Sequence, residues 1–175
     1  MTKAENLDPL SLIINADLAE LFLIAHFPDE ATEQSRKTIE MDPNFAFGHN
    51  QLAQVYLQKH MFPEAIAELE KAIQISGGSP TFTANLARAY AATNKKVEAL
   101  GLLNDLKRSS APGNAYAAEI AMIYAALGDK DQAMVWLEKG YEERFNPGVL
   151  LRPGLDPLRS DPRFQELIRR IRLPS

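Results

Sequence analysis

Small and apolar residues recur along this chain at a fixed interval of 34 positions. The interval is clearest when residues 46–72 are compared with the segments on either side of them. Four series of equivalent positions follow it: Leu18, Leu52, Leu86 and Ile120; Ala19, Ala53, Ala87 and Ala121; Phe22, Tyr56, Tyr90 and Tyr124; and Ala31, Ala65, Ala99 and Ala133. No insertion or deletion shifts the register across the four copies. A period of this length indicates an array of structural repeats.

Each copy is predicted to form a hairpin of two helices. Apolar residues follow helical spacing on both sides of a short turn. The four turns fall at equivalent positions, near His26, His60, Asn94 and Gly128. By the period, the four hairpins occupy residues 12–45, 46–79, 80–113 and 114–147.

The segments outside these four copies are predicted separately. Leu7-Asp8-Pro9 lies 34 residues before Met41-Asp42-Pro43, so residues 1–11 are predicted to be the tail of a preceding repeat. After Glu143 the period fails, and closely spaced prolines prevent a regular helix. Residues 144–175 are therefore predicted to form an irregular strap, over 144–160, followed by a capping helix over 162–172.

Position by position, the repeat resembles the tetratricopeptide repeat (TPR), and the resemblance covers about residues 12–143. It implies an all-α fold, namely a right-handed TPR superhelix, or α-solenoid, of about four helix-turn-helix repeats with a C-terminal capping helix. The segment 156–164 is also similar to the end of C-terminal TPR regions in large bacterial regulators and kinases. One departure concerns the fourth position of the repeat, where the family's aromatic residue is replaced by Asn15, His49, Thr83 and Ala117.

Composition limits the chemistry and the location of the protein. The chain has no Cys, which excludes disulfides and thiolate chemistry. Its net charge of -4 argues against nucleic-acid binding, although residues 144–175 hold seven Arg against three acidic residues. The apolar stretch after Leu10 is interrupted by Asp17 and Glu20, so it fails as a signal core or a membrane span. We therefore expect a cytoplasmic protein that contacts neither nucleic acid nor a membrane directly.

No group of residues indicates catalysis or a cofactor. His26 and His60 are equivalent residues of adjacent hairpins, so they should lie on the order of 10 Å apart. That separation is too large for a shared metal ion with ligands at about 2 Å. The sequence contains no glycine-rich phosphate loop and no Ser/His/Asp set at a suggestive spacing. We predict a protein that is not an enzyme and that has no metal site or cofactor.

The resemblance to TPR proteins also implies a binding surface, because the first helix of each hairpin lines a concave groove in that family. The corresponding positions here combine polar amides with small residues. Amides can pair with both the donors and the acceptors of an extended backbone, and the forked donors of Arg88 suit a carboxylate. The residues predicted to contact a bound peptide are Phe47, Asn50, Gln54, Asn85, Arg88 and Met122.

These observations predict a scaffold for protein–protein interaction that binds a peptide or helix of a partner protein in its groove. Two alternatives stay open at this point. The chain could serve as a sensory or assembly arm of a larger bacterial regulator whose DNA-binding or kinase activity lies elsewhere. It could also serve as a module for weak self-association through its N-terminal hairpin, where Leu10, Leu12 and Ile13 are expected to lack a preceding repeat.

The variant Ala99→Leu tests the repeat register. Ala99 belongs to a series of small residues that is predicted to let the two helices of each hairpin approach closely. A leucine there should overpack the hairpin by about 1–3 kcal/mol and lower the melting temperature. An unchanged melting temperature would count against the register.

Overall fold

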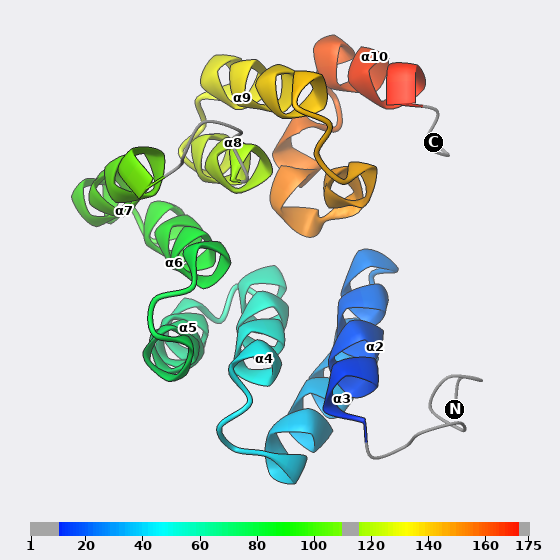
Figure 1. Cartoon of the computed structure of the whole chain (residues 1–175), viewed down its shortest axis with the longest axis vertical. Coiled ribbons are helices and arrows are strands. Elements are labelled where there is room, and N and C mark those ends of the chain that lie inside the picture. The colour runs from blue at the N-terminus through cyan, green and yellow to red at the C-terminus, as the bar shows by residue number, and fades with distance from the viewer. Residues whose placement is uncertain (1–10, 110–115, 172–175) are drawn as a thin grey trace. The chain divides into compact units, whose positions relative to one another are not determined.

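The computed structural model describes residues 11–109 and 116–171, and every regular element within these ranges is a helix (Figure 1). The predicted all-α class is therefore confirmed. The predicted tail of a preceding repeat lies, except for Ser11, outside the described residues. The chain divides into two compact units, which we treat separately: unit 1 is Met1–Phe82 and unit 2 is Thr83–Ser175.

Unit 1 contains two helical hairpins. The first is formed by α2 (Leu12–Ile24) and α3 (Pro28–Met41), and the second by α4 (Ala46–Gln58) and α5 (Phe62–Ser76). The helices of each hairpin pack on each other, and α4 also packs on both α2 and α3. The first helix of the second hairpin therefore joins the two hairpins.

Unit 2 contains two further helical pairs and a C-terminal segment. Helix α6 (Pro80–Ala92) begins at the boundary between the units and is followed by α7 (Lys96–Ser109), α8 (Ala117–Ala126) and α9 (Lys130–Glu142). The residues expected as an irregular strap contain two 3-10 helices, η1 (Pro147–Leu151) and η2 (Pro153–Leu158). The final helix, α10, spans Pro162–Ile171.

The period extends to the backbone conformation of the turns. The residue in the middle of each hairpin turn adopts a positive φ, close to 60° in the first three repeats and 83° in the fourth. These residues are His26, His60, Asn94 and Gly128, which are spaced 34 positions apart. A left-handed residue ends a helix by turning the chain sharply, and glycine or asparagine adopts it at least cost. The two histidines are thus turn residues, and the protein accepts the strain of a larger side chain there.

The two alanine series form the seams between helices. Ala19, Ala53, Ala87 and Ala121 are completely buried, and so are Ala31, Ala65, Ala99 and Ala133. A methyl group is the largest side chain that these close approaches admit without shifting the helices, because protein interiors are close-packed. The same residues that reveal the period in the sequence therefore set the spacing of the helices.

A polar pair joins the two helices of each hairpin in unit 1. Asn15 is fully buried and accepts a short hydrogen bond from Gln34. The equivalent residues one repeat later are His49 and Glu68, whose Nδ1 and Oε2 atoms lie 2.5 Å apart. His49 Nε2 also lies 2.9 Å from the carbonyl oxygen of Pro43, which can only accept a hydrogen bond. His49 therefore connects α4 both to α5 and to the loop from the first hairpin.

The same two positions carry different residues in unit 2. They hold Thr83 and Leu102 in the third repeat, and Ala117 and Trp136 in the fourth. The contact between polar residues at these two positions is therefore a feature of the hairpins of unit 1.

Helix α10 closes one end of unit 2. Its residues Phe164, Leu167 and Ile168 are buried in one cluster with Met134 and Leu137 of α9. Burying each large apolar side chain stabilises the fold by about 1.5–3 kcal/mol, so α10 is held firmly over α9. No helix in the described part of the chain is both long enough and apolar enough to cross a lipid bilayer.

The pair His49 and Glu68 can be tested by a double-mutant cycle. His49→Leu should lower the free energy of unfolding by about 1–3 kcal/mol, because Glu68 and the Pro43 carbonyl lose their partner. Adding Glu68→Leu should recover part of this loss, since two apolar residues then face each other. Urea unfolding of both single variants and the double variant measures the coupling. Glu70→Leu, on the exposed side of α5, is the control, and strictly additive effects would show that the pair does not couple.

Candidate peptide-binding faces

In unit 1, the predicted groove residues lie along α4. Phe47 is half-buried and meets Phe45 edge to face, with ring centroids 6.3 Å apart. Asn50 is almost completely buried, at 2% exposure, whereas Gln54 one turn later is half-buried. We call Phe47, Asn50 and Gln54 the unit 1 face. This face offers the edge of the Phe47 ring and the half-buried amide of Gln54, and the amide of Asn50 lies buried beneath them.

In unit 2, the predicted residues lie beneath the chain's own C-terminal segment. Asn85 is buried and accepts a hydrogen bond of 2.9 Å from Arg88 Nη1. A Cβ atom placed on Gly154 would lie 2.6 Å from Met122 Sδ and 2.7 Å from Arg88 Cζ. Only glycine allows the backbone to approach these two side chains so closely. We call Asn85, Arg88 and Met122 the unit 2 face.

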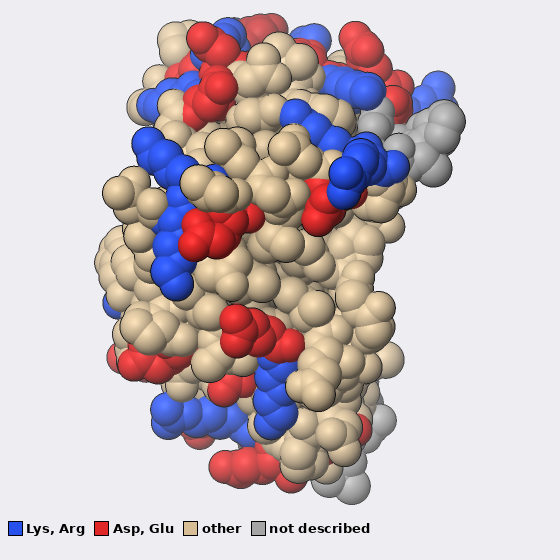
Figure 2. Space-filling model, turned by 90° about the vertical axis from the view of Figure 1, so that its left-hand side faces the viewer, with Lys and Arg blue, Asp and Glu red and all other residues tan. Residues whose placement is uncertain are grey.

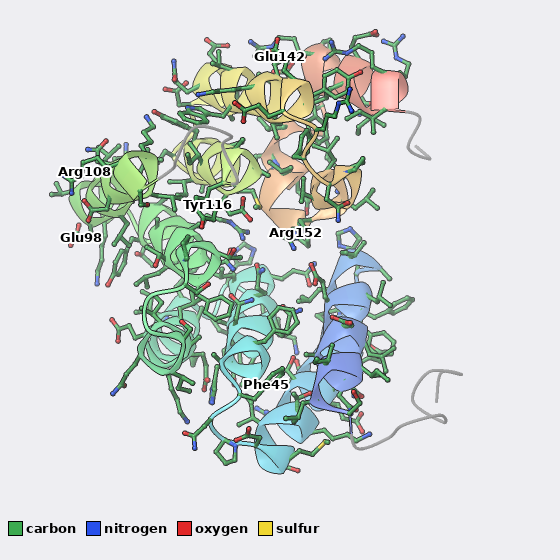
Figure 3. All side chains as sticks on the ribbon, viewed as in Figure 1. Phe45, Glu98, Arg108, Tyr116, Glu142 and Arg152 are labelled. Atoms are coloured by element: carbon green, nitrogen blue, oxygen red, sulfur yellow. The ribbon has the colours of Figure 1, made fainter. Side chains whose placement is uncertain are left out.

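Residues on either side of Gly154 bring charges to the unit 2 face. Arg152, which lies between η1 and η2 and is labelled in Figure 3, has its Nη1 atom 3.7 Å from Glu119 Oε1. Asp156 of η2 lies near Arg88 and favours its charged form. Helix η2 also packs along α8, which carries Glu119 and Met122. The segment 152–156 therefore covers the unit 2 face with an arginine, a glycine and an aspartate.

Burial changes the ionisation of two residues at this face. The pKa of the Arg88 guanidinium is lowered to about 10 by its burial and by the charge of Arg152, against the opposing effect of Asp156. Burial also raises the pKa of the Glu119 carboxyl, while a backbone hydrogen bond and Arg152 lower it. For both groups the cost of desolvation thus exceeds the opposing interactions, so that ionisation carries a net cost in the folded protein.

Several of the six predicted residues are less exposed to solvent than the sequence analysis expected. The prediction treated all of them as accessible to a ligand. Asn50, Asn85 and Met122 are at most 3% exposed, and Arg88 packs against Gly154. The contribution of Arg152, Gly154 and Asp156 was missed, because these residues follow the point at which the period fails and no spacing relates them to α6 or α8.

Among the described residues, no group of three or more His, Asp or Glu side chains could hold a metal ion. His26 and His60 occupy turns, and His49 is engaged between Glu68 and Pro43. None of these arrangements places a nucleophile beside a base and an acid, which enzymatic acyl transfer would require.

The arginines of the C-terminal segment pair largely with the chain's own carboxylates. Arg163 binds Asp131 at 2.8 Å and Asp161, and Arg170 binds Glu138 of α9. The hydrogen bonds from Arg163 lower the pKa of Asp161 to about 2, and Asp161 in turn accepts the backbone N–H of Arg163 at the start of α10. On the face drawn in Figure 2, Lys and Arg lie interspersed with Asp and Glu, without a broad patch of one sign. This distribution does not resemble the concentrated basic face of a nucleic-acid binder.

Comparison with known sequences identifies the repeat. Two sequence models, each described as tetratricopeptide repeat, match residues 56–119 and 116–147, and together they span more than half of the chain. The chain belongs to the tetratricopeptide-repeat family. TPR proteins are typically scaffolds for protein–protein interaction rather than enzymes, so membership supports a scaffold role. No match to a curated protein was found for the sequence of this TPR chain.

Solved TPR structures share the fold at low sequence identity. MamA is 20% identical, with 81% of this chain and 82% of that chain covered and a TM-score of 0.55. YrrB, described as "a TPR protein with an unusual peptide-binding site", is 19% identical, with coverages of 95% and 88% and a TM-score of 0.55. TPR-like repeats of a putative kinesin light chain from Podosopora anserina are 21% identical, with coverages of 94% for both chains and a TM-score of 0.54. At these identities the likeness concerns the fold alone.

The raised pKa of Glu119 predicts how Glu119→Gln changes stability with pH. Because the folded pKa lies above the unfolded value of about 4.3, ionisation costs the folded state free energy. This cost is absent below the unfolded pKa and fully present above the folded pKa. The variant should therefore gain stability relative to the natural chain as pH rises from about 4 towards neutrality.

Urea unfolding across this pH range measures the difference, with Glu98→Gln on the exposed side of α7 as the control. A difference that moves in the opposite direction would show that pairing with Arg152 outweighs the desolvation of Glu119.

Proposed function

We propose that this TPR chain is a protein-interaction scaffold that holds an extended peptide of its partner on the unit 1 face. The observation that carries the proposal is the grouping of Phe47, Asn50 and Gln54 on one side of α4, at the positions that line the groove in TPR proteins. The description of the similar protein YrrB as having a peptide-binding site supports this class of ligand.

The chemistry of the unit 1 face suits the backbone of an extended peptide. An extended peptide presents N–H and C=O groups that find no partner within itself, and an amide side chain can both donate to them and accept from them. The Phe47 ring adds an apolar surface for one side chain of the ligand. Recognition through the backbone predicts modest sequence selectivity, with the aromatic contact selecting an apolar residue.

The unit 2 face has a different role in this proposal. The segment 152–156 occupies it as an internal ligand, with its arginine near Glu119 and its aspartate near Arg88. Leu150, Leu155 and Leu158 anchor this segment and are fully buried. Losing the burial of each leucine would cost about 1.5–3 kcal/mol, so a partner peptide does not readily displace the segment. Asn85, Arg88 and Met122 therefore contact a partner only when segment 152–156 leaves.

Peptide selection followed by site-directed variants tests the proposal. Peptides are selected from a random library on the immobilised chain, and their affinities are then measured by fluorescence anisotropy. The double variant Phe47→Ala/Gln54→Ala should bind the selected peptides at least about tenfold more weakly, because it removes the aromatic edge and the accessible amide. Asn50 is left in place, since its burial makes a change there a risk to folding.

The matched control is Glu64→Ala/Glu70→Ala, which changes two exposed residues of α5 in the same unit. It should leave the affinity unchanged, and both double variants should unfold at temperatures close to that of the natural chain. Equal affinity of all three proteins for the selected peptides would overturn the assignment of the unit 1 face.

A further inference from the structure

Two lysine side chains of unit 2 lie on the ring of Trp136. Lys107 Nζ of α7 is 5.6 Å from the centroid of this ring, and Lys139 Nζ of α9 is 4.7 Å from it. Lys107 Nζ also lies 4.7 Å from the centroid of the Tyr124 ring on α8. Helix α8 packs on both α7 and α9, which brings these side chains together (Figure 1). We call Lys107, Tyr124, Trp136 and Lys139 the Trp136 site.

Carboxylates of the described residues do not neutralise the Trp136 site. Most described arginines of unit 2 pair with carboxylates, as Arg170 does with Glu138. Within the described ranges, no carboxylate forms an ion pair with Lys107 or Lys139. Residues 110–115, which connect α7 to α8, contain no Asp or Glu. An aromatic ring attracts an ammonium group through its face but carries no net charge, so two positive charges remain at the site.

The aromatic contacts also hold the two ammonium groups in place before any ligand arrives. Lys107 and Lys139 are both half-buried, and each lies over a ring of the protein's own core. A long side chain that is already ordered loses less conformational entropy when a ligand binds. The Trp136 site is therefore better prepared for a ligand than a pair of lysines that extend freely into water.

Hydrogen-bond donors accompany these charges. Lys107 donates a hydrogen bond to the hydroxyl oxygen of Tyr124. An ammonium group has three N–H donors, so this bond uses only one of the donors of Lys107. A tyrosine hydroxyl that accepts a hydrogen bond keeps its own hydrogen for a further acceptor. With the second ammonium group of Lys139, the site can donate to several oxygen atoms of one anion.

A phosphate group matches this combination better than a carboxylate does. A phosphorylated side chain carries a charge of about −1.5 to −2 at pH 7 and three strong acceptor oxygens. It balances both lysines, whereas a carboxylate brings one negative charge and two oxygens. A nucleic acid, with its row of phosphates, needs a concentrated basic face that two lysines do not supply.

We propose that the Trp136 site binds the phosphate group of a phosphorylated side chain on a partner protein. Lys107 and Lys139 balance the charge of the phosphate, and the Tyr124 hydroxyl donates to one of its oxygens. A phosphorylated protein suits a chain whose family membership supports a scaffold role. The site lies in unit 2 and is distinct from the unit 1 face.

The chain contains a single Trp, which reports directly on this site. Peptides with a fixed phosphoserine and random flanks are selected on the immobilised chain, and Trp136 emission is then recorded as a selected peptide is added. The phosphopeptide should change the emission saturably, because it draws the ammonium groups towards its oxygens and alters their contact with the ring. Its twin with unmodified serine should leave the emission unchanged. No saturable change, or the same change with both peptides, would overturn the proposal.

Inorganic phosphate is the third probe and identifies the source of the ligand. It should bind at least about tenfold more weakly than the selected phosphopeptide, because a partner's flanking residues add contacts of their own. Equal affinity for inorganic phosphate would overturn the assignment to a side chain of a partner protein.

The double variant Lys107→Gln/Lys139→Gln should bind the labelled phosphopeptide at least about tenfold more weakly by fluorescence anisotropy, because charge-assisted hydrogen bonds are lost. The matched control Lys95→Gln/Lys130→Gln removes two other lysines of unit 2, one of which, Lys95, lies over the Tyr90 ring. It should leave the affinity unchanged. Equal weakening in both double variants would overturn the site, since only the net charge of the chain would then matter.

Tyr124→Phe is a milder second variant, which keeps a ring under Lys107 and removes only the hydroxyl. It should weaken binding of the phosphopeptide about threefold or more, and unchanged affinity would overturn the role of the hydroxyl. The variant Phe47→Ala/Gln54→Ala should keep the affinity for the phosphopeptide. Failure at the Trp136 site is thereby distinguished from failure of the unit 1 face.

Discussion

The structure depends on the close approach of neighbouring helices at positions where only a very small side chain fits. Two alanines in each repeat, exemplified by Ala53 and Ala65, are completely buried where these helices meet. A hairpin held together in this way is thin and leaves apolar surface on both of its faces. Each hairpin must therefore find a neighbour, which is why stability in a repeat protein comes from the interfaces between repeats. Helix α10 meets this need in unit 2, where it covers apolar residues of α9.

Polar residues that enter this packing find hydrogen-bond partners within it. In unit 1, the buried Asn15 and His49 each find a partner on the second helix of their own hairpin. A buried polar group without a partner costs about 1–3 kcal/mol, so the two positions must change together. In unit 2 the corresponding positions hold Thr83 and Leu102 in one repeat and Ala117 and Trp136 in the other. The repeats thus keep the same pair of helices while the residues at these two positions change.

The sequence predicted the features that depend on local spacing. The helical hairpins, the equivalent turns and the buried alanines all follow from the period, because each repeat meets the same steric constraint. The period did not predict that segment 152–156 covers the unit 2 face. Gly154 approaches Arg88 and Met122 across a long separation in sequence and after the period has ended, so neither periodicity nor motif relates them. In the sequence, Asn15 and His49 stand out only because they replace the family's aromatic residue. Their partners Gln34 and Glu68 lie on another helix, so local spacing does not predict the two hydrogen-bonded pairs.

We propose that the unit 1 face receives a partner's peptide, because the chain's own segment 152–156 occupies the unit 2 face. Nuclear Overhauser contacts in the free chain in solution test this most directly, with the Met122 methyl group and the Gly154 α protons isotope-labelled. A strong cross-peak between them is expected, because no side chain separates Gly154 from Met122. A folded chain without this cross-peak would contradict the proposal that segment 152–156 covers the unit 2 face, since this face would then be accessible to a ligand.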